Sequence, residues 1–350
     1  MGCTRALRAG LTMGIVLGAV PPILYAAPAR GTPVREVPIQ KAPARDVPVR
    51  EAPAREAPAR KGAVREAAVP EAPVREVSAI EALATELYWT PARMAAATPA
   101  GDGTAASPRG HVAGHASAAG RVAHAFHGVP SVGVLFFTSR RARDHFCTAS
   151  VVRSARHNLL LTAAHCLYAY DHDRRRAHYA SHLAFVPRYE RTRAPYGVWT
   201  AKHLYVPAGW VRRGDVDQDF GFVTLRRDRA GRDIADVTGS NRLVPNVRLP
   251  AAIRVIGYPT VRYSAADRPI YCDTVARRRF RWQNTFACGG FYGGTSGSPW
   301  LWRYDPDRRQ GQVIGIVGGY HAGGRRHDRS YSALFDDDVA ALRARAEKLG

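Results

Sequence analysis

The distribution of apolar residues divides the chain at about Phe126. Beyond this position, short apolar runs are separated by Gly, Pro, Asn and Asp, the residues that favour turns. The clearest runs lie at residues 132–137, 149–152, 159–161, 220–225, 253–256 and 313–317. Short, spaced runs with many β-branched residues are typical of an all-β barrel or sandwich, and they do not favour alternating βαβ units.

A helical pattern is predicted only at the end of this region. Asp336, Asp337 and Asp338 can cap a helix, and Val339, Leu342 and Leu349 share it with Arg and Lys near its C-terminus. We therefore expect an all-β domain that ends in a C-terminal helix.

Before Phe126 the chain contains no core-forming runs. Residues 32–77 repeat a Pro-Val/Ala-Arg-Glu theme, and the prolines recur too often for a regular helix. The pattern predicts an extended, disordered segment of alternating charge. A short helix is expected between Glu76 and Ala97, and the Gly- and Ala-rich residues 99–120 are typical of a linker.

The first residues are typical of an export signal. Arg5 and Arg8 precede a mostly apolar stretch, residues 9–20, and small residues near Ala26 offer cleavage sites. The stretch is short for a membrane span, although an anchor is the alternative interpretation. We expect a signal peptide at 1–26, a disordered Pro/Ala/Arg-rich pro-region or linker at 27–122 and a folded domain at 123–350. The product is then secreted to the extracellular space, without a membrane anchor after signal removal.

The chain is strongly basic, with 51 Lys and Arg against 29 Asp and Glu and a formal net charge of +22. A basic surface can attract nucleic acid, acidic polysaccharide or an acidic membrane. The arginines are scattered, however, and often adjoin an acid, as at residues 35–36, 50–51 and 55–56. We therefore expect no specific nucleic-acid partner, and a polyanion-binding protein is kept as an alternative function.

Four cysteines remain once Cys3 is removed with the signal: Cys147, Cys166, Cys272 and Cys288. An even number in an oxidising compartment suggests two disulfides. Four cysteines allow three pairings, and their number alone does not choose among them.

Three motifs carry candidate chemistry. Residues 293–299 read Gly-Gly-Thr-Ser-Gly-Ser-Pro, and a nucleophilic serine needs such a tight turn with backbone N–H groups aimed at the developing oxyanion. His165 follows an apolar run and precedes Cys166, which suits a rigidly held general base. Asp219 begins another apolar run, where a carboxylate can orient the histidine ring. Each motif alone also fits a surface loop, a structural histidine or a turn aspartate, but the three occur together.

Together these motifs resemble the chymotrypsin superfamily of serine peptidases. Residues 162–166 resemble the family's histidine motif, Asp219 with its apolar strand the aspartate motif, and residues 294–299 the serine motif. The likeness covers roughly residues 126–349. It implies two six-stranded antiparallel β-barrels and a secreted endopeptidase that hydrolyses peptide bonds through an acyl-enzyme.

The resemblance assigns a role to each residue. It implies His165 as general base, Asp219 as its orienting partner and Ser296 as nucleophile, with the backbone N–H groups of Gly294 and Ser296 as the oxyanion hole. It also implies the bridges Cys147–Cys166 and Cys272–Cys288. The partners are then protein or peptide substrates, no cofactor or metal is expected, and we expect a monomer.

Departures from the family pattern bear on specificity. Thr295 stands where animal digestive members carry the Asp that receives a newly cut N-terminus, so the motif is closer to the bacterial branch that includes glutamyl endopeptidases. Gly290 stands where members that cleave after Arg or Lys have Asp. His321 is displaced from the histidine position of the glutamyl enzymes. Gly318 and Gly319 resemble the segment that pairs with the substrate backbone.

Other candidates have simpler interpretations. Asp171, His172, Asp173, His178 and His182 lack tight metal-ligand spacing and are interpreted as a solvated loop. Asp217 competes with Asp219, which adjoins the strand directly. Tryptophans are interpreted as core residues or subsite walls; they are Trp210, Trp282, Trp300 and Trp302. A catalytically inactive binding protein on the same fold is the second alternative function.

Overall fold

The computed structural model describes residues 74–100, 121–139, 143–170, 177–260 and 268–350. The predicted signal peptide at 1–26 and the repeat up to residue 73 lie outside the described residues. Among the described residues, no helix combines the length and the apolar character that a membrane crossing requires.

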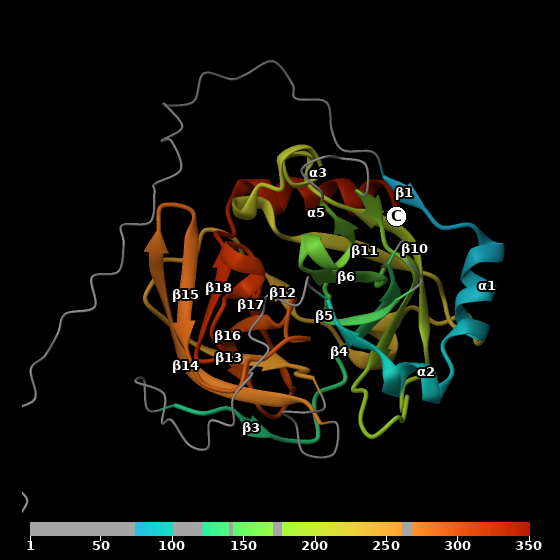
Figure 1. The fold of residues 1–350 in the computed structure, drawn as a ribbon, viewed down its shortest axis with the longest axis horizontal. Helices are drawn as coiled ribbons and strands as arrows, with labels where there is room; N and C mark the ends of the chain where they lie inside the picture. The colour runs from blue at the N-terminus through green and yellow to red at the C-terminus, as the bar shows by residue number, and fades with distance from the viewer. Residues whose placement is uncertain (1–73, 101–120, 140–142, 171–176, 261–267) are drawn as a thin grey trace, which may run out of the picture. The chain divides into compact units, whose positions relative to one another are not determined.

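The first half of the domain is a closed barrel of antiparallel strands (Figure 1). Its strands are β4 (Val132–Thr138), β5 (Asp144–Val152), β6 (Leu159–Thr162), β9 (Ser181–Pro187), β10 (Trp199–Tyr205) and β11 (Gly221–Leu225). They pair in the order β10-β11-β6-β5-β4-β9, and β9 pairs with β10 to close the circle. Leu135, Phe185 and Phe222 are fully buried in the core of this half.

The second half is another antiparallel sheet, coloured orange to red in Figure 1. Its strands are β13 (Ala251–Gly257), β14 (Ile270–Phe280), β15 (Gln283–Ala287), β16 (Pro299–Asp305), β17 (Gln310–Ile316) and β18 (Arg329–Ala333). Just beyond β17, the backbone N–H of Gly318 donates to the carbonyl of Tyr331 on β18 at 3.0 Å. Val255, Phe286 and Trp300 are buried in a separate core beneath this sheet.

The remaining elements are short, apart from α1 and α5. The strands are β1 (Arg75–Glu76), β2 (Thr98–Pro99), β3 (His124–Ala125), β7 (Tyr168–Ala169), β8 (His178–Tyr179) and β12 (Arg242–Leu243). The α-helices are α1 (Ala79–Tyr88), α2 (Pro91–Ala96), α3 (Ala208–Arg213), α4 (Ile234–Thr238) and α5 (Asp337–Leu349). The 3-10 helices are η1 (Ala164–Cys166), η2 (Val216–Gln218) and η4 (Tyr320–Gly323).

The C-terminal helix α5 confirms the prediction of a terminal helix on an all-β domain. The Asp336 side chain accepts the N–H of Asp338 at 3.0 Å and caps the helix. Val339 and Leu342 are buried, whereas Leu349 is exposed and Ala346 contributes to the buried face instead.

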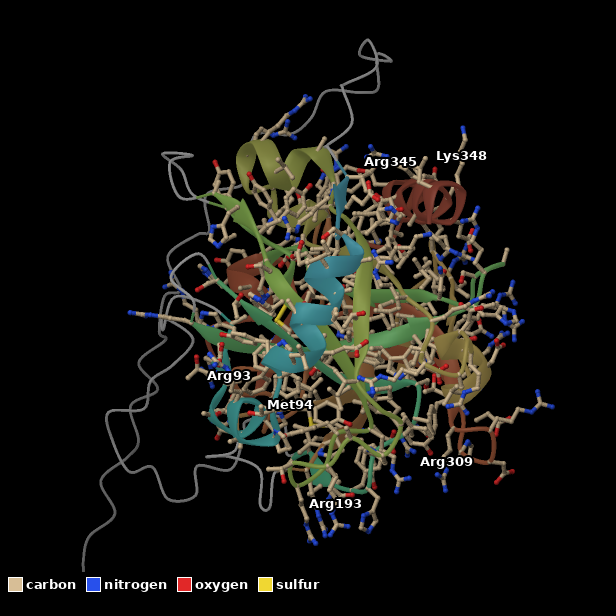
Figure 2. The ribbon with its side chains drawn as sticks, turned by 90° about the vertical axis from the view of Figure 1, so that its right-hand side faces the viewer. Arg93, Met94, Arg193, Arg309, Arg345 and Lys348 are labelled. Atoms are coloured by element: carbon tan, nitrogen blue, oxygen red, sulfur yellow. A yellow bond between two sulfur atoms is a disulfide. The ribbon has the colours of Figure 1, made fainter. Side chains whose placement is uncertain are left out.

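Residues 74–100 differ from the expectation for the pro-region. They form two helices rather than one, and β1 pairs with β10. Trp89 and Met94, which is labelled in Figure 2, are buried in the core of the first half. The region 27–122, expected to be a disordered pro-region or linker, therefore contains a folded segment that contributes to the core. Trp89 directly follows Leu87 and Tyr88, but Leu87 is exposed, so the apolar run at 87–89 does not by itself show which side chain is buried.

Arginine side chains are spread over the surface rather than gathered in one stripe. Figure 2 shows Arg93, Arg193, Arg309 and Arg345 on separate parts of the molecule. Several arginines pair with carboxylates, as Arg93 does with Asp144 at 3.2 Å. Exposed pairs of this kind contribute little to stability, typically about 0–1 kcal/mol each.

Candidate active site

His165 and Asp219 meet at one end of the first barrel because of strand register. β6 and β11 pair antiparallel, with Thr162 opposite Gly221. The residues that follow β6 therefore lie beside those that precede β11. His165 lies in η1, directly after β6, and Asp219 follows η2, directly before β11. Nδ1 of His165 lies 2.8 Å from Oδ2 of Asp219.

The Asp219 carboxylate is fully buried and accepts hydrogen bonds from two further groups. The backbone N–H of His165 donates to Oδ1 at 3.0 Å, and the backbone N–H of Gly319 donates to Oδ2 at 2.8 Å. A carboxylate acceptor at Nδ1 selects the tautomer in which that nitrogen carries the proton. Nε2 of the neutral ring is then the basic nitrogen.

Asp217, the competing candidate, has another partner. Its carboxylate accepts a hydrogen bond from Nε2 of Gln283 at 2.8 Å. The same Nε2 donates to the carbonyl of Val216 at 3.0 Å, and Oε1 of Gln283 accepts the backbone N–H of Tyr320 at 3.1 Å. The structure thus brings Asp219, rather than Asp217, to the histidine ring.

Ser296 lies in the loop between β15 and β16, and this loop is held from two sides. On one side, Thr148 of β5 donates its N–H to the carbonyl of Ser296 at 2.7 Å and its hydroxyl to the carbonyl of Gly294 at 3.0 Å. On the other side, the N–H of Gly297 donates to the carbonyl of Val317 at 2.7 Å. Thr148 is fully buried, so these bonds are shielded from water.

Two glycines are required by the shape of the loop. Gly294 has φ +95° and Gly297 has φ +83°, in the region that L side chains rarely adopt. A Cβ on Gly294 would lie 2.2 Å from the Phe146 ring, and one on Gly297 would lie 2.0 Å from the carbonyl oxygen of Thr148. Neither position tolerates a side chain without moving β5.

The backbone N–H groups of this loop divide into two sets. Those of Thr295, Gly297 and Ser298 donate within the protein, to the carbonyls of Tyr292, Val317 and Thr295 respectively. Within the described parts of the chain, those of Gly294 and Ser296 have no hydrogen-bond acceptor. They are the two groups that the resemblance assigns to the oxyanion hole.

Two connections link the serine loop to the histidine–aspartate pair. Thr148, which binds the loop, adjoins Cys147, and the disulfide Cys147–Cys166 connects it to the residue after His165. The segment Val317–Gly319 binds Gly297 at one end and Asp219 at the other. Both predicted disulfides, Cys147–Cys166 and Cys272–Cys288, are confirmed.

The four tentative substrate-binding residues have different neighbours in the structure. Gly318 and Gly319 lie against Asp219: a Cβ on Gly318 would lie 3.2 Å from its Oδ2. His321 lies in η4 with φ +52°, and its ring centroid is 4.0 Å from that of Tyr320. Burial, together with the nearby charge of Arg325, lowers the pKa of His321. Gly290 has φ +107°, and its carbonyl accepts the N–H of Tyr292 at 3.0 Å.

Trp210 lies beside the ring of His165. Its ring centroid lies 6.3 Å from that of His165, and its Nε1–H donates to the carbonyl of Tyr168 at 3.0 Å. Trp300 is fully buried in the second core. The interpretation as core residues is confirmed for Trp210 and Trp300, and the interpretation as subsite walls stays a prediction.

Among the described residues, a cluster with metal-ligand atom types consists of Cys147, His165 and Cys166, whose candidate ligand atoms lie within 4.8 Å of one another. Both sulfurs are engaged in the disulfide, so neither is a thiolate ligand. Asp171, His172 and Asp173 lie outside the described residues. The His182 ring stacks on Tyr88 at 4.3 Å.

Sequence reasoning missed Gln283 and Thr148. Gln283 is a buried glutamine in a strand, and Thr148 is a threonine in the middle of an apolar strand. Neither stands in a motif with catalytic spacing. Their roles depend on loops that only the folded chain brings to them.

Known proteases resemble this chain in sequence and in fold. The family model described as Trypsin matches residues 120–334. The protease Anisep from Arthrobacter nicotinovorans has a crystal structure that is 26% identical, with TM-score 0.57, over 65% of this chain and all of that one. The thermostable serine protease AL20 from an extremophilic microorganism is 24% identical, with TM-score 0.55, over 63% of this chain and 98% of that one.

A curated relative, the extracellular metalloprotease of Bacillus subtilis (strain 168), is 30% identical over 79 residues. This match spans 23% of each protein, so the chain covers about a quarter of that relative's length. The family assignment instead rests on the match over residues 120–334, which contains His165, Asp219 and Ser296. The chain belongs to the trypsin family of chymotrypsin-like serine peptidases.

Proposed function

We propose that the protein is an exported serine endopeptidase in which Ser296 is the nucleophile, His165 the general base and Asp219 the residue that orients the histidine. The observation that carries this proposal is the 2.8 Å contact between Nδ1 of His165 and the buried Asp219 carboxylate. The contact lies at the end of the barrel where the serine loop is attached. A trypsin-family domain with this pair intact supports catalysis over binding alone.

The reaction proceeds in two stages. In the first, Oγ of Ser296 attacks the carbonyl carbon of the scissile peptide bond and passes its proton to Nε2 of His165. The oxyanion that forms accepts hydrogen bonds from the N–H groups of Gly294 and Ser296. The C–N bond then breaks, and His165 returns the proton to the leaving amine. An acyl group remains on Ser296.

In the second stage, water replaces the amine. His165 removes a proton from the water as it attacks the acyl carbon, and a second oxyanion forms in the same place. The proton returns to Oγ of Ser296 as the ester bond breaks, which releases the acid product. Asp219 stabilises the imidazolium in both stages, because its negative charge lies beside Nδ1.

Gly290 bears on the cleavage specificity of the enzyme, and the disulfides bear on the compartment in which it works. Gly290 offers no carboxylate to pair with a basic substrate side chain, so we do not expect cleavage to require Arg or Lys. The two disulfides suit an oxidising compartment, which supports export.

The test is to digest a random peptide library with the refolded protein and to sequence the cleavage sites. We expect cleavage by the wild-type chain and by Ser298→Ala, which changes a neighbouring buried serine of the same loop. Ser296→Ala should lower the rate by about 10⁴- to 10⁶-fold. Comparable cleavage by Ser296→Ala and Ser298→Ala would refute the proposal.

A further inference from the structure

The N-terminal segment ends as a strand on the edge of β5. Thr98 and Pro99 of β2 pair in parallel with His145 and Phe146. The N–H of Ala100 donates to the carbonyl of Phe146 at 3.0 Å, and the Thr98 hydroxyl donates to the carbonyl of Asp144 at 3.2 Å. The outward-facing hydrogen-bonding groups of β5 at this point are therefore used by the chain's own residues 98–100.

This strand lies beside the serine loop. A Cβ built on Gly293 would lie 3.0 Å from Cβ of Pro99 and 3.2 Å from its Cγ, so the proline ring lies over the backbone of Gly293. Gly293 directly precedes Gly294, which contributes one N–H to the oxyanion hole in the proposed function. Phe146, whose carbonyl binds Ala100, also packs against Gly294.

Residues 98–100 are held there by the helices that precede them. Trp89 and Met94 are 3% and 5% exposed, and Nε1–H of Trp89 donates to the carbonyl of His182 on β9. Met94 is four residues before Thr98 and is labelled on α2 in Figure 2. A strand tethered this closely competes as an intramolecular ligand, at an effective concentration in the millimolar range.

An endopeptidase binds an extended substrate on both sides of its nucleophile. One way for an extended peptide to bind is to add its backbone to an exposed strand edge. On one side of the serine loop, the resemblance assigns the part that becomes the acyl group to the segment with Gly318 and Gly319. On the other side, the available edge is β5 at Phe146, next to Gly293.

We infer that residues 98–100 occupy, in cis, the site for the substrate residues that follow the scissile bond, and thereby restrain the enzyme. This inference rests on the proposed function. A protein substrate must displace the strand, because both need the Phe146 carbonyl and the space over Gly293. A small reagent that reacts with Ser296 without extending along β5 does not compete with it.

The test compares two activities of the full-length chain. One is the hydrolysis of fluorescently labelled casein, which extends past the scissile bond. The other is the rate of covalent labelling of Ser296 by diisopropyl fluorophosphate, which does not. Ala100→Pro removes the N–H that binds Phe146, and Pro99→Ser removes the ring over Gly293 without removing that N–H.

The matched control is Ala92→Pro. Ala92 is exposed in the first turn of α2, where a proline is tolerated. We expect Ala100→Pro to raise the ratio of casein hydrolysis to labelling roughly fivefold, the equilibrium effect of losing one backbone hydrogen bond. Pro99→Ser should raise it as well, and Ala92→Pro should leave it unchanged.

An unchanged or lowered ratio in both Ala100→Pro and Pro99→Ser would overturn the inference, since the strand would then be neutral or would assist substrate binding. If Ala100→Pro does not fold, Pro99→Ser decides the question alone. Failure of the wild-type chain to become labelled at Ser296 would overturn the proposed function, and this inference with it.

Discussion

The Asp219 carboxylate holds His165 at two points: Oδ2 lies 2.8 Å from ring Nδ1, and Oδ1 accepts the backbone N–H of the same histidine at 3.0 Å. The second bond fixes the start of η1, and the first fixes the ring on it. Because the carboxylate is fully buried, water does not compete for either bond. The orientation of the proposed base therefore depends on one residue.

Replacing Asp219 tests whether the orientation of His165 depends on this carboxylate. Asp219→Asn should keep the fold and lower kcat by roughly 10⁴-fold, because an amide that donates to Nδ1 imposes the wrong tautomer. The matched control is Asp217→Asn, because the wild-type carboxylate of Asp217 binds Gln283 rather than His165. Steady-state kinetics on a peptide identified from the library provide the measurement. A larger loss in Asp217→Asn than in Asp219→Asn would reverse the assignment.

Gln283 connects the segment before Asp219 to the segment after Gly319, through Val216, Asp217 and Tyr320. Gln283→Leu leaves these groups without their buried partner, so we expect it to lower the free energy of unfolding by about 1–3 kcal/mol. It should also lower kcat, because η2 and η4 both adjoin Asp219.

The control for Gln283 is Gln312→Leu. Gln312 is a half-buried glutamine of β17 whose side chain makes no hydrogen bond within the described parts of the chain. Urea unfolding of both variants provides the measurement. Equal stability of the two variants would show that Gln283 does not connect these segments.

The motifs around His165, Asp219 and Ser296 were predictable because each is local. An apolar run followed by a polar residue specifies both a strand and the point where it ends. Strand register then brings the ends of β6 and β11 together, as the pairing of Thr162 with Gly221 shows. The all-β class and the C-terminal helix follow from the same periodicities.

Three other features could not be predicted from local sequence patterns: the buried residues of the N-terminal segment, the pairing of β2 with β5 and the role of Gln283. The residues with helical spacing in this segment, Ile80, Leu83 and Leu87, are exposed, so the apolar period does not identify Trp89 and Met94 as the buried side chains. The pairing of β2 with β5 is parallel and joins residues far apart in sequence, so no turn signals it. Gln283 resembles any polar residue of a strand until its three partners are known.

The contribution of the N-terminal segment to the fold is measurable. Trp89→Ala should lower the free energy of unfolding by about 3–5 kcal/mol, the usual cost of removing a buried aromatic side chain. Leu87→Ala is the control, because Leu87 is 73% exposed and should change stability by less than about 0.5 kcal/mol. Urea denaturation distinguishes them. Equal stabilities would mean that residues 74–100 do not form part of the folded core.

His145, which lies beneath β2, should make stability depend on pH. Burial lowers its pKa below the ordinary value of 6.5, against the opposing effect of hydrogen bonds with the backbone of Pro99 and Thr98. As the pH falls below 6.5, the unfolded chain takes up this proton before the folded one does. Stability is therefore greatest above pH 6.5 and decreases as the pH falls toward the lowered pKa.

The variant His145→Gln isolates this contribution, because the two proteins differ only at this residue. We expect the wild-type chain to lose more stability than His145→Gln between pH 7 and pH 5, as measured by urea unfolding at each pH. Parallel pH profiles for the two proteins would contradict the expected effect of burial on His145.

The central claim is that Ser296 is a nucleophile activated by His165, and covalent labelling tests it most directly. The full-length protein is treated with diisopropyl fluorophosphate, digested and mapped by mass spectrometry. The account predicts one residue that carries a diisopropylphosphoryl group, Ser296, with no labelling in Ser296→Ala and full labelling in Ser298→Ala. Labelling at another serine, or none in a folded wild-type chain, would contradict it.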